Sequence, residues 1–211
     1  MRLADLRIQY RDADLLLEHL DPDPLRQFAV WLADAVAAGQ REPNATALAT
    51  VDPDGTPSVR MVLLKGIDDG RFVVYTNLES RKARALDAEP RCALTFWWDG
   101  LERQVRVEAH AERVADAVAD AYFASRPRGS QLGAWASRQG EAIGDRAVLE
   151  AAHAEADRRF PDAVVRPPFW GGYALTPRAI EFWQGRASRL HDRFRYERDD
   201  AGAWARTRLS P

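Results

Sequence analysis

The stretch TALATVDPDGTPSVRMVLLKGIDDGRFVVYT, residues 46–76, decides the fold class. It holds three short runs of strand-forming residues, separated by the turn signals DPDG and DDG. Runs joined by such tight turns predict neighbouring antiparallel strands. The runs RCALTFWW and LERQVRVEAHAERV extend the pattern to residue 114. Because several runs are apolar on both sides, we expect the strands to form a closed antiparallel sheet, a small barrel.

Helical patterns lie on either side of these strands. Asp23 is a typical helix cap, Pro24 fits the first turn, and an apolar stripe continues to a stop at Gly39. Further helices are expected at 81–86, 116–125 and 143–160, and further strands at 171–177, 179–185, 189–198 and 203–209. The prediction is an α+β protein with flanking helices, in which residues 1–20 form an N-terminal arm and residues 21–211 a single domain.

The composition excludes several classes of protein. With 211 residues and 46% hydrophobic content, the chain is long enough to bury a core. Its 30 basic and 32 acidic residues leave no positive excess for binding a nucleic acid. No apolar stretch is long enough for a membrane span, and no signal segment opens the chain. The single cysteine, Cys92, fits a buried residue in a reducing compartment, so we expect a cytoplasmic protein.

Common catalytic motifs are absent from the sequence. The four histidines, at positions 19, 110, 153 and 191, are too scattered to suggest a metal site, and one cysteine cannot build a zinc site. The sequence also lacks a G-x-S-x-G nucleophile turn, a P-loop and a G-x-G-x-x-G dinucleotide motif. We therefore predict no metal, and neither serine-hydrolase, P-loop nor Rossmann chemistry.

The segment TNLESRKARAL, residues 76–86, places two cations at a helix start. Arg81 and Lys82 follow the expected cap, Ser80, in the first turn, where unpaired backbone N–H groups already make the helix end positive. Cations there destabilise the helix unless an anion binds. A helix start with neighbouring Arg and Lys side chains is a favourable site for a phosphate.

Two other segments carry cations that suit a second phosphate. In RMVLLK, strand alternation places Arg60 and Lys65 on opposite faces, and solvated strand ends are the simpler explanation for that pair alone. In AYFASRPRGS, Tyr122 and Arg126 have helical spacing, and the following proline ends the helix so that Ser130 folds back toward them. These three side chains form either a phosphate clamp or a solvated helix terminus.

The segment RLHDR, residues 189–193, is a further cationic cluster. If it is extended, Arg189, His191 and Arg193 share one face, where they repel one another unless an anion or an electron-rich ring compensates. His191 either assists proton transfer or is an ordinary hydrogen-bonded surface residue. Trp183, just upstream, either packs in the core or forms a wall against a flat ring. Two phosphate sites beside such a face are typical of an enzyme with two phosphorylated ligands.

From about Asp23 to Pro211 the sequence resembles the pyridoxamine 5′-phosphate oxidase family. The likeness is carried by the ordered motifs RMVLLK, YTN, SRKA, LERQV, SRPRGSQLGAWAS, FWGGY, EFWQG, RLHDRF and RLSP. It implies a Greek-key-like, FMN-binding split β-barrel that works as a homodimer with the flavin at the subunit interface. It also implies oxidation of pyridoxamine or pyridoxine 5′-phosphate to pyridoxal 5′-phosphate, with hydride transfer from the substrate C4′ to N5 of FMN and reduction of O2 to H2O2.

The resemblance also implies roles for individual residues. Arg81 and Lys82 would bind the flavin phosphate, and Arg189 and His191 would be catalytic, flanking the substrate's pyridine ring. The full set of FMN contacts would be Arg60, Met61, Val62, Leu63, Leu64, Lys65, Tyr75, Thr76, Arg81, Lys82, Gln104, Gln139, Gly140, Trp183 and Arg193. The substrate would be bound by Lys65, Tyr122, Arg126, Ser130, Arg189, Leu190 and His191.

Some segments depart from the family pattern. Gly140 stands where a serine is common, WWDG lacks the usual proline, and Arg7 and Tyr10 in RIQY only partly match an arm that covers the substrate. Two other functions stay open. One is a protein on the same fold that binds or carries pyridoxal 5′-phosphate without turning it over, and the other is a redox relative that uses a deazaflavin.

Overall fold

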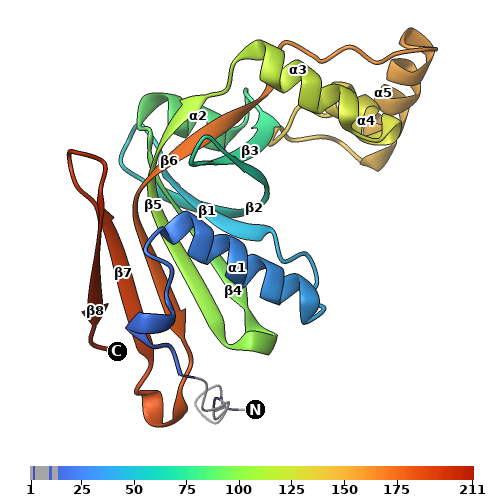
Figure 1. Ribbon diagram of the computed structural model, residues 1–211. Coiled ribbons are helices and arrows are strands. Elements are labelled where there is room, and N and C mark those ends of the chain that lie inside the picture. Colours follow the sequence, from blue (N-terminus) through green and yellow to red (C-terminus); the bar gives the residue numbers. More distant parts are fainter. Residues whose placement is uncertain (1, 3–9, 11–13) are drawn as a thin grey trace.

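Six antiparallel strands close into a barrel in the computed structural model, which describes residues 2, 10 and 14–211 (Figure 1). The order around the barrel is β3-β2-β1-β4-β5-β6, and pairing of β6 with β3 closes it. Strands β7 and β8 extend the sheet beyond β6. The predicted α+β fold with a closed antiparallel barrel is confirmed. The strands are β1 (Ala45–Val51), β2 (Pro57–Asp68), β3 (Arg71–Asn77), β4 (Arg91–Trp98), β5 (Arg103–Arg113), β6 (Trp170–Gln184), β7 (Asp192–Arg198) and β8 (Trp204–Leu209).

Aromatic side chains fill the barrel. Phe72, Phe96 and Phe182 are fully buried. The ring of Phe28 meets those of Phe72 and Phe96 at centroid distances of 5.1 and 4.9 Å, in edge-to-face arrangements. Cys92 is buried as predicted, and burial raises the pKa of its thiol to about 12. The burial of these rings, together with the aliphatic side chains around them, provides the hydrophobic stabilisation of the barrel.

Helix α1 (Pro24–Ala37), which contributes Phe28, lies across the barrel and begins as predicted (Figure 1). The side chain of Asp23 accepts a hydrogen bond from the backbone N–H of Leu25 at 2.9 Å, and Pro24 takes the first helical position. The chain leaves the helix through Gly39, whose φ of +70° is easily adopted only by glycine. Both ends of this helix were therefore predictable from local chemistry.

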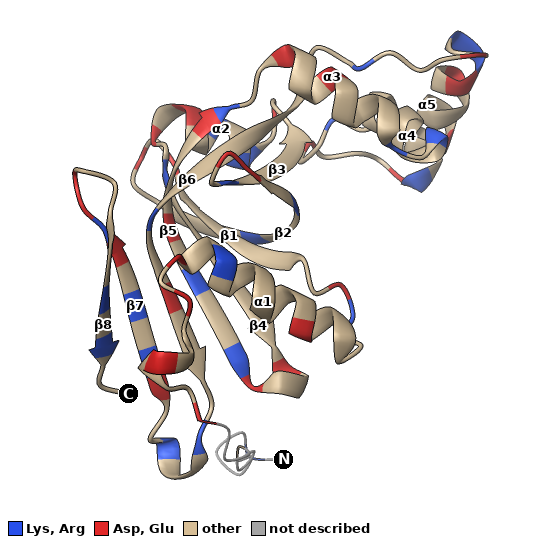
Figure 2. Ribbon diagram, viewed as in Figure 1, with Lys and Arg blue, Asp and Glu red and all other residues tan. Residues whose placement is uncertain are grey.

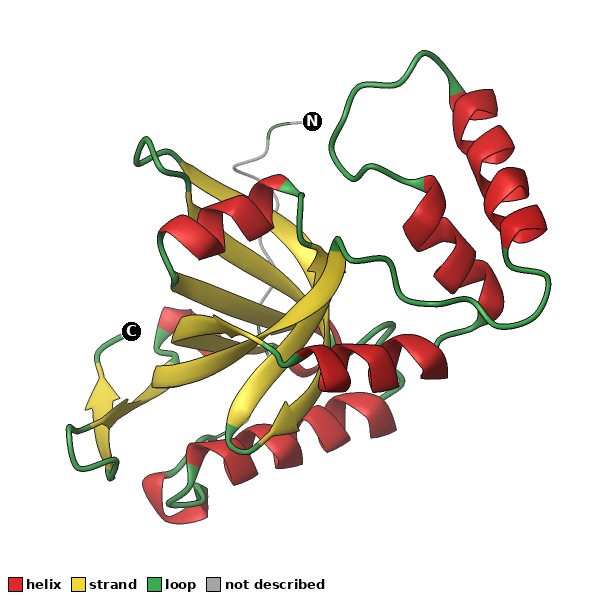
Figure 3. Cartoon of the chain, turned by 90° about the horizontal axis from the view of Figure 1, so that it is seen from above, coloured by secondary structure: helices red, strands yellow, loops and turns green. Residues whose placement is uncertain are grey.

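Helices α3 (Asp116–Ser125), α4 (Arg128–Ala136) and α5 (Arg146–Arg159) form a group on one side of the barrel (Figures 1 and 3). The sequence predicts α3 correctly but not α4, a nine-residue helix in which Gly129 and Gly133 lower the intrinsic helix propensity. Helix α5 begins later than residue 143 because Asp145 caps it, accepting a hydrogen bond from the N–H of Val148 at 3.3 Å.

Strand β6 is continuous where the sequence predicts two strands. Opposite β5 the ladder passes directly from Ala179 to Pro177, so the intervening Arg178 is an extra residue. This bulge accommodates the proline, which has no N–H to donate to the ladder. As a result, one strand pairs with β5, β3 and β7.

The N-terminal segment contributes to the core before α1 begins. Leu15 and Leu20 belong to the buried cluster of the barrel, and a short 3-10 turn, Leu17–His19, lies between them. Basic and acidic residues are interspersed over the barrel and the helices (Figure 2). Across the described part of the chain, no helix has the length and apolar character needed to cross a membrane.

Gly172 pairs with Tyr75 where β6 closes the barrel against β3, and a larger residue does not fit there. A Cβ atom at this position would lie 2.7 Å from Cδ1 of Tyr75 and 2.8 Å from the carbonyl oxygen of Val74. Because a backbone oxygen in a ladder cannot move aside, we expect Gly172→Ala to lower the free energy of unfolding by about 1–3 kcal/mol. Chemical denaturation measures this change. Gly129→Ala is the control, because its added Cβ meets no atom within 4 Å apart from its chain neighbours and the backbone of its own helix. An equal midpoint in both variants would contradict the close approach.

Candidate functional site

An open groove of about 810 Å³ lies where β2 and β3 meet α3 and α4. It brings the two predicted phosphate sites into one place, although their residues are far apart in the sequence. The expected FMN contacts that line it are Arg60, Met61, Val62, Leu63, Lys65, Tyr75, Thr76, Lys82 and Gln139, and the expected substrate contacts are Lys65, Tyr122, Arg126 and Ser130.

Neutral oxygen atoms surround Lys82 in this groove. Its Nζ donates to Oε1 of Gln139 at 2.6 Å, to Oγ1 of Thr76 at 3.1 Å and to Oγ of Ser80 at 3.2 Å. Burial, and then the charge of nearby Arg60, lower the pKa of Lys82 to about 8. A bound anion would favour the charged ammonium and oppose both effects.

Helix α2 (Arg81–Ala88) begins without a side-chain cap. Ser80 is buried, and its hydroxyl accepts from Lys82 instead of bonding a backbone N–H. The first N–H groups of a helix have no acceptor within it, and the earliest in α2 to be bonded is that of Ala83, to the carbonyl oxygen of Ser80 at 3.0 Å. This leaves the start of α2 open to an anion. Arg81 turns to Asp52, with Nε 2.8 Å from Oδ2, and this pair raises the pKa of Arg81. Arg81 is therefore already paired with a carboxylate, whereas Lys82 is bonded to neutral oxygens.

Arg60 is held rigidly beside Lys82. Its Nη1 donates to the carbonyl oxygen of Leu48 at 3.0 Å and to Oγ1 of Thr50 at 2.8 Å, and its Nη2 donates to Oγ of Ser58 at 2.7 Å. All three acceptors are neutral, and burial, followed by the charge of Arg81, lowers the pKa of Arg60. The groove thus has a positive wall that its own hydrogen bonds do not neutralise.

Lys65 lies at a β-bulge. Leu64 and Gly66 pair with adjacent residues of β3, so Lys65 is an extra residue in β2. A bulge changes the alternation of side chains. Arg60 and Lys65 consequently line the same groove, although uninterrupted alternation places them on opposite faces. Leu64 is buried in the barrel core, where its side chain supports the groove wall from inside.

An aromatic stack forms the other wall of the groove. Tyr75 lies on Tyr122 at a centroid distance of 3.9 Å and on Trp170 at 5.4 Å, with nearly parallel rings. The guanidinium of Arg126 sits 4.7 Å from the ring centre of Trp170. Its Nη1 is buried and has no hydrogen-bond partner among the described residues, and burial lowers the pKa of Arg126. Such an orphaned donor is suited to an anionic acceptor.

A second cluster lies on β5, β6 and β7, outside the groove. Trp183 pairs across the sheet with Gln104 on one side and with Arg193 on the other. Arg193 is neutralised by the buried carboxylate of Glu181, with Nε 2.8 Å from Oε1. None of these three expected FMN contacts lines the groove of the same chain. The predicted cofactor set is thus divided between two places.

Arg189 and His191 lie in a turn, which corrects the expected strand from residue 189. Residues Ala187–Arg189 form a 3-10 turn, and Ser188 and Arg189 have φ angles of +57° and +63°. Strand β7 begins only at Asp192. Arg189, His191 and Arg193 therefore do not share one extended face, because the backbone reverses before the strand starts. Leu190, between them, is 68% exposed.

His191 is enclosed by aromatic rings and one backbone donor. Its ring centre lies 4.5 Å from that of Trp183 and 5.6 Å from that of Tyr10. The backbone N–H of Arg186 donates to Nδ1 of His191 at 3.0 Å. Burial, and then the charge of Arg189, lower the pKa of His191. Arg7, the other residue predicted in the arm, lies outside the described residues.

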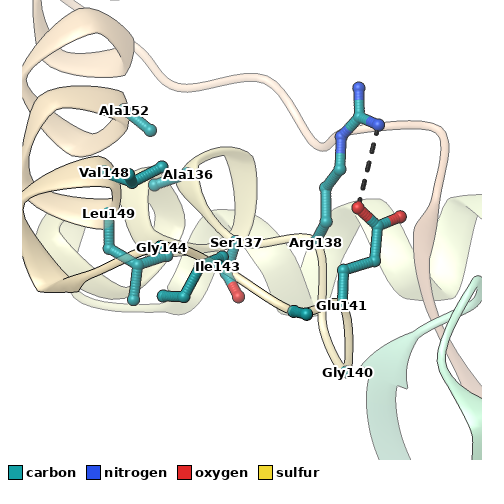
Figure 4. Close-up of a pocket in the computed structure, with 11 residues that line it drawn as sticks. Ala136, Ser137, Arg138, Gly140, Glu141, Ile143, Gly144, Val148, Leu149 and Ala152 are labelled. Carbon is teal, nitrogen blue, oxygen red and sulfur yellow. Dashed lines mark ion pairs between the residues drawn. The ribbon is translucent and has the colours of Figure 1, made fainter.

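Gly140 does not line the groove but a neighbouring hollow. This hollow, of about 540 Å³, lies between the end of α4 and α5, and Gly140 forms the tip of the loop beneath it (Figure 4). An ion pair at 3.9 Å between Arg138 and Glu141 spans that loop tip. The adjacent Gln139 faces Lys82, so the loop reaches the groove through one side chain.

Some residues of the site were not predicted from the sequence. Trp170 completes the aromatic stack, and only its place in the motif FWGGY pointed to it. The buried carboxylates of Glu181 and Asp192 bind arginines of the second cluster, and no local pattern marks them. Among the described residues, no group of three or more His, Cys, Asp or Glu side chains is arranged to bind a metal.

Two protein-family models match the chain. One, described as pyridoxamine 5′-phosphate oxidase, matches residues 32–159. The other, described as the pyridoxine 5′-phosphate oxidase C-terminal dimerisation region, matches residues 170–211. The first match contains the strands and helices of the groove, and the second contains Trp183, Arg189, His191 and Arg193.

Individual relatives agree with these matches. The chain is 57% identical to the pyridoxine/pyridoxamine 5′-phosphate oxidase of Rubrobacter xylanophilus over 99% of this chain and 96% of that protein. It is 54% identical to pyridoxine/pyridoxamine 5′-phosphate oxidase 1 of Ralstonia nicotianae over 99% of each. The structure of PhzG from Burkholderia lata, in complex with tetrahydrophenazine-1-carboxylic acid, superposes with a TM-score of 0.88 at 33% identity, over 95% of this chain and 100% of that one. A pyridoxamine 5′-phosphate oxidase-related, FMN-binding protein from Nostoc punctiforme shares the fold, with a TM-score of 0.75 at 17% identity over 91% and 100% of the chains.

Proposed function

The chain belongs to the pyridoxamine 5′-phosphate oxidase family, and from this premise we propose that it is an FMN-dependent oxidase. It converts pyridoxamine and pyridoxine 5′-phosphate to pyridoxal 5′-phosphate and reduces O2 to H2O2. One observation carries the proposal: a single groove holds two separate groups of cationic side chains, one around Lys82 and one around Arg126, with an aromatic stack beside the second. Two phosphorylated aromatic ligands bound next to each other need such an arrangement.

The residues around Lys82 fit the phosphate of FMN. Lys82 and Arg60 are bonded to neutral oxygens, and the start of α2 has no side-chain cap, so a phosphate would supply the missing negative charge. Arg81, which is ion-paired with Asp52, would add a second cation near this phosphate. When bound, FMN supplies the ring system that takes two electrons from the substrate and passes them to O2.

The residues around Arg126 fit the phosphate of the substrate. The orphaned Nη1 of Arg126, the Lys65 ammonium and the hydroxyls of Tyr122 and Ser130 line one part of the groove. They bind a phosphate by charge-assisted hydrogen bonds and thereby fix the distance between the substrate ring and the cofactor. Positioning of this kind accounts for most of the expected rate.

The proposal includes a homodimer, because the expected cofactor contacts are divided between two places on one chain. Val59 and Met61 on the outer side of β2 are 66% and 64% exposed. A mostly apolar hollow of about 580 Å³ lies nearby, on the outer side of β1, β4 and β5. Exposed apolar side chains beside such a hollow favour a subunit interface. In a two-fold dimer, the β5–β7 cluster of one protomer would complete the groove of its partner, and the match to a dimerisation region supports this arrangement.

An oxidase assay with the purified protein tests the function. We expect a yellow protein with a flavin spectrum that forms H2O2 and pyridoxal 5′-phosphate from pyridoxamine 5′-phosphate in air. Tight binding of pyridoxal 5′-phosphate without any peroxide would instead identify a carrier protein. A spectrum lacking the flavin bands, and restored activity with a deazaflavin, would identify a different redox relative.

The substrate phosphate separates this function from that of the structural relative bound to a phenazine carboxylic acid. A tricyclic carboxylic acid carries no phosphate, whereas the groove offers four side chains that suit one. We therefore expect unphosphorylated pyridoxamine to react far more slowly than pyridoxamine 5′-phosphate. Equal rates for the two would remove the support that Arg126 and its neighbours give to the proposal.

Arg189→Met is expected to lower kcat for pyridoxamine 5′-phosphate at least tenfold while leaving the Kd of FMN within about twofold. Arg189 is exposed in its turn, so its guanidinium is available to hold the substrate ring, and it lies outside the residues proposed to bind the FMN phosphate. Steady-state kinetics and flavin titration measure the two effects. Arg198→Met, a change at the other end of β7, is the control, and equal turnover in both variants would exclude Arg189 from the reaction.

A further inference from the structure

The turn that carries Arg189 and His191 is held in an unfavourable backbone conformation. Ser188 and Arg189 both have left-handed φ angles, +57° and +63°, and neither is glycine. Two adjacent non-glycine residues adopt this conformation only where surrounding contacts hold them in place. The contacts that hold the turn therefore decide where the two proposed catalytic side chains point.

Arg186 makes those contacts at both ends of the turn. Its backbone N–H donates to Nδ1 of His191 at 3.0 Å, and its Nη1 lies 3.2 Å from Oδ2 of Asp192. One residue thus links the first position of the turn to the two residues that end it. Because Nδ1 of His191 accepts this bond, neutral His191 carries its proton on Nε2 and offers that N–H to a ligand.

Arg186 forms an ion pair with the buried carboxylate of Asp192, whose own position is fixed by further hydrogen bonds. The side chain of Asp192 is 2% exposed, and besides Arg186 its oxygens accept from the backbone N–H of Leu15 at 3.2 Å and from the guanidinium of Arg208. Arg186 also pairs with Asp14. A buried carboxylate with donors from three separate segments cannot move without breaking several charge-assisted bonds.

We infer that Arg186 and Asp192 are positioning residues for the oxidase reaction. Asp192 anchors the side chain of Arg186, and this ion pair holds the turn so that the backbone N–H of residue 186 stays bonded to Nδ1 of His191 and fixes its tautomer. The same pair connects the turn to residues 14–15 of the N-terminal segment. This inference rests on the proposed function, since it assigns to two ion-paired residues a role in turnover. Ordinary stabilisation of the fold is the competing explanation, because a buried ion pair can serve that purpose alone.

The two explanations differ in what a matched pair of variants does. Arg186→Met keeps the backbone N–H that bonds His191 and removes only the side-chain pairs with Asp192 and Asp14. Asp192 stays bonded to Leu15 and Arg208, so the buried carboxylate keeps partners and the protein folds. Arg195→Met is the control: Arg195 is similarly half-buried and also bonds two carboxylates, Glu108 at 2.8 Å and Glu197 at 2.9 Å, but it does not contact the turn. We expect kcat to fall at least tenfold in Arg186→Met and to stay within twofold in Arg195→Met, with FMN content unchanged in both.

Hydrogen exchange gives a readout that does not depend on turnover. The amide of residue 186 bonds Nδ1 of His191 only while the turn holds its shape, and the side-chain pair of Arg186 with Asp192 is proposed to hold it. Exchange across residues 185–191 is therefore expected to accelerate at least tenfold in Arg186→Met, which loses that pair, and not in Arg195→Met. Asp192→Asn provides a double-mutant cycle: if the two residues act as a unit, the double variant is no slower than the slower single variant. If Asp192→Asn does not fold, the comparison of Arg186→Met with Arg195→Met still tests the inference.

The outcomes are distinguishable. A flavin-loaded parent protein that oxidises nothing would refute the proposed function and this inference with it. An active parent together with an equally active Arg186→Met variant would overturn the positioning role alone. Losses of equal size in Arg186→Met and Arg195→Met, or unchanged exchange at residues 185–191, would also overturn it in favour of general stabilisation.

Discussion

Arg126→Met is expected to lower kcat/KM for pyridoxamine 5′-phosphate by roughly a hundredfold. The half-buried guanidinium lies against Trp170, and its buried Nη1 has no hydrogen-bond partner among the described residues, so this donor is available to the substrate phosphate. Loss of one or two charge-assisted hydrogen bonds costs about 3 kcal/mol, which corresponds to that factor. Most of the effect should appear in KM, because phosphate binding is present before and during the reaction.

The neighbouring arginine provides the matched control for this change. Arg128 lies two residues further on, but its guanidinium bonds the carbonyl oxygens of Phe160 and Asp162 and not the groove. Arg128→Met should therefore reduce stability without changing KM for the phosphorylated substrate. For Arg126→Met, the rate with unphosphorylated pyridoxamine should be nearly the same as in the parent protein. A loss of equal size with both substrates would show that Arg126 does not recognise the phosphate.

Lys82→Met is expected to raise the Kd of FMN by roughly a hundredfold. The ammonium is bonded only to neutral oxygens among the described residues, and no side-chain cap competes for the start of α2, so a phosphate there gains a strong charge-assisted contact. Removal of that contact costs about 2–3 kcal/mol. Titration of apoprotein with FMN, followed by flavin fluorescence, measures the change.

The pKa of Lys82 predicts how the affinity for FMN depends on pH. The pKa of Lys82 is about 8 in the ligand-free protein, so the ammonium is charged below that pH and neutral above it. The FMN phosphate is already doubly charged above about pH 7, since its second pKa is about 6. Affinity should therefore fall by no more than about twofold between pH 7 and 8, and by up to tenfold per unit above 8. Lys82→Met should bind FMN weakly and show no such fall.

Arg84 provides the control on the same helix. Its guanidinium bonds the backbone carbonyl of Glu79 and does not line the groove. Arg84→Met should bind FMN with the affinity and the pH dependence of the parent protein. If Lys82→Met is purified yellow with an unchanged Kd, the phosphate of FMN does not lie at the start of α2.

Much of the fold could be predicted because its signals are local. The turns DPDG and DDG fix the β1–β2–β3 meander, and Asp23 with Pro24 marks the start of α1. Helix α4 was missed because its two glycines weaken the local pattern, and packing against α5 has to compensate. Strand β6 was divided at Pro177 because a bulge, which only the partner strand reveals, allows the ladder to continue.

The site was predictable in part for the same reason. A helix start with Lys82 and the grouping of Tyr122, Arg126 and Ser130 depend on spacing within one segment, and these residues do line one groove. Partners distant in sequence could not be anticipated: Asp52 binds Arg81, and Glu181 binds Arg193. The turn at Ser188 and Arg189 was likewise hidden, because Arg186 and Asp192, which hold it, are themselves bonded to the N-terminal segment and to β8.

The position of β6 in the chain has a consequence for biosynthesis. This strand follows α5, so on the ribosome the emerging chain exposes unpaired edges on β3 and β5 until residues 170–184 have been translated. Such edges favour aggregation of nascent or prematurely terminated chains. Trp170, the first residue of β6, also completes the aromatic wall. If the groove binds FMN as proposed, the flavin can be captured only after β6 has emerged, and fragments that stop before residue 170 should accumulate in inclusion bodies.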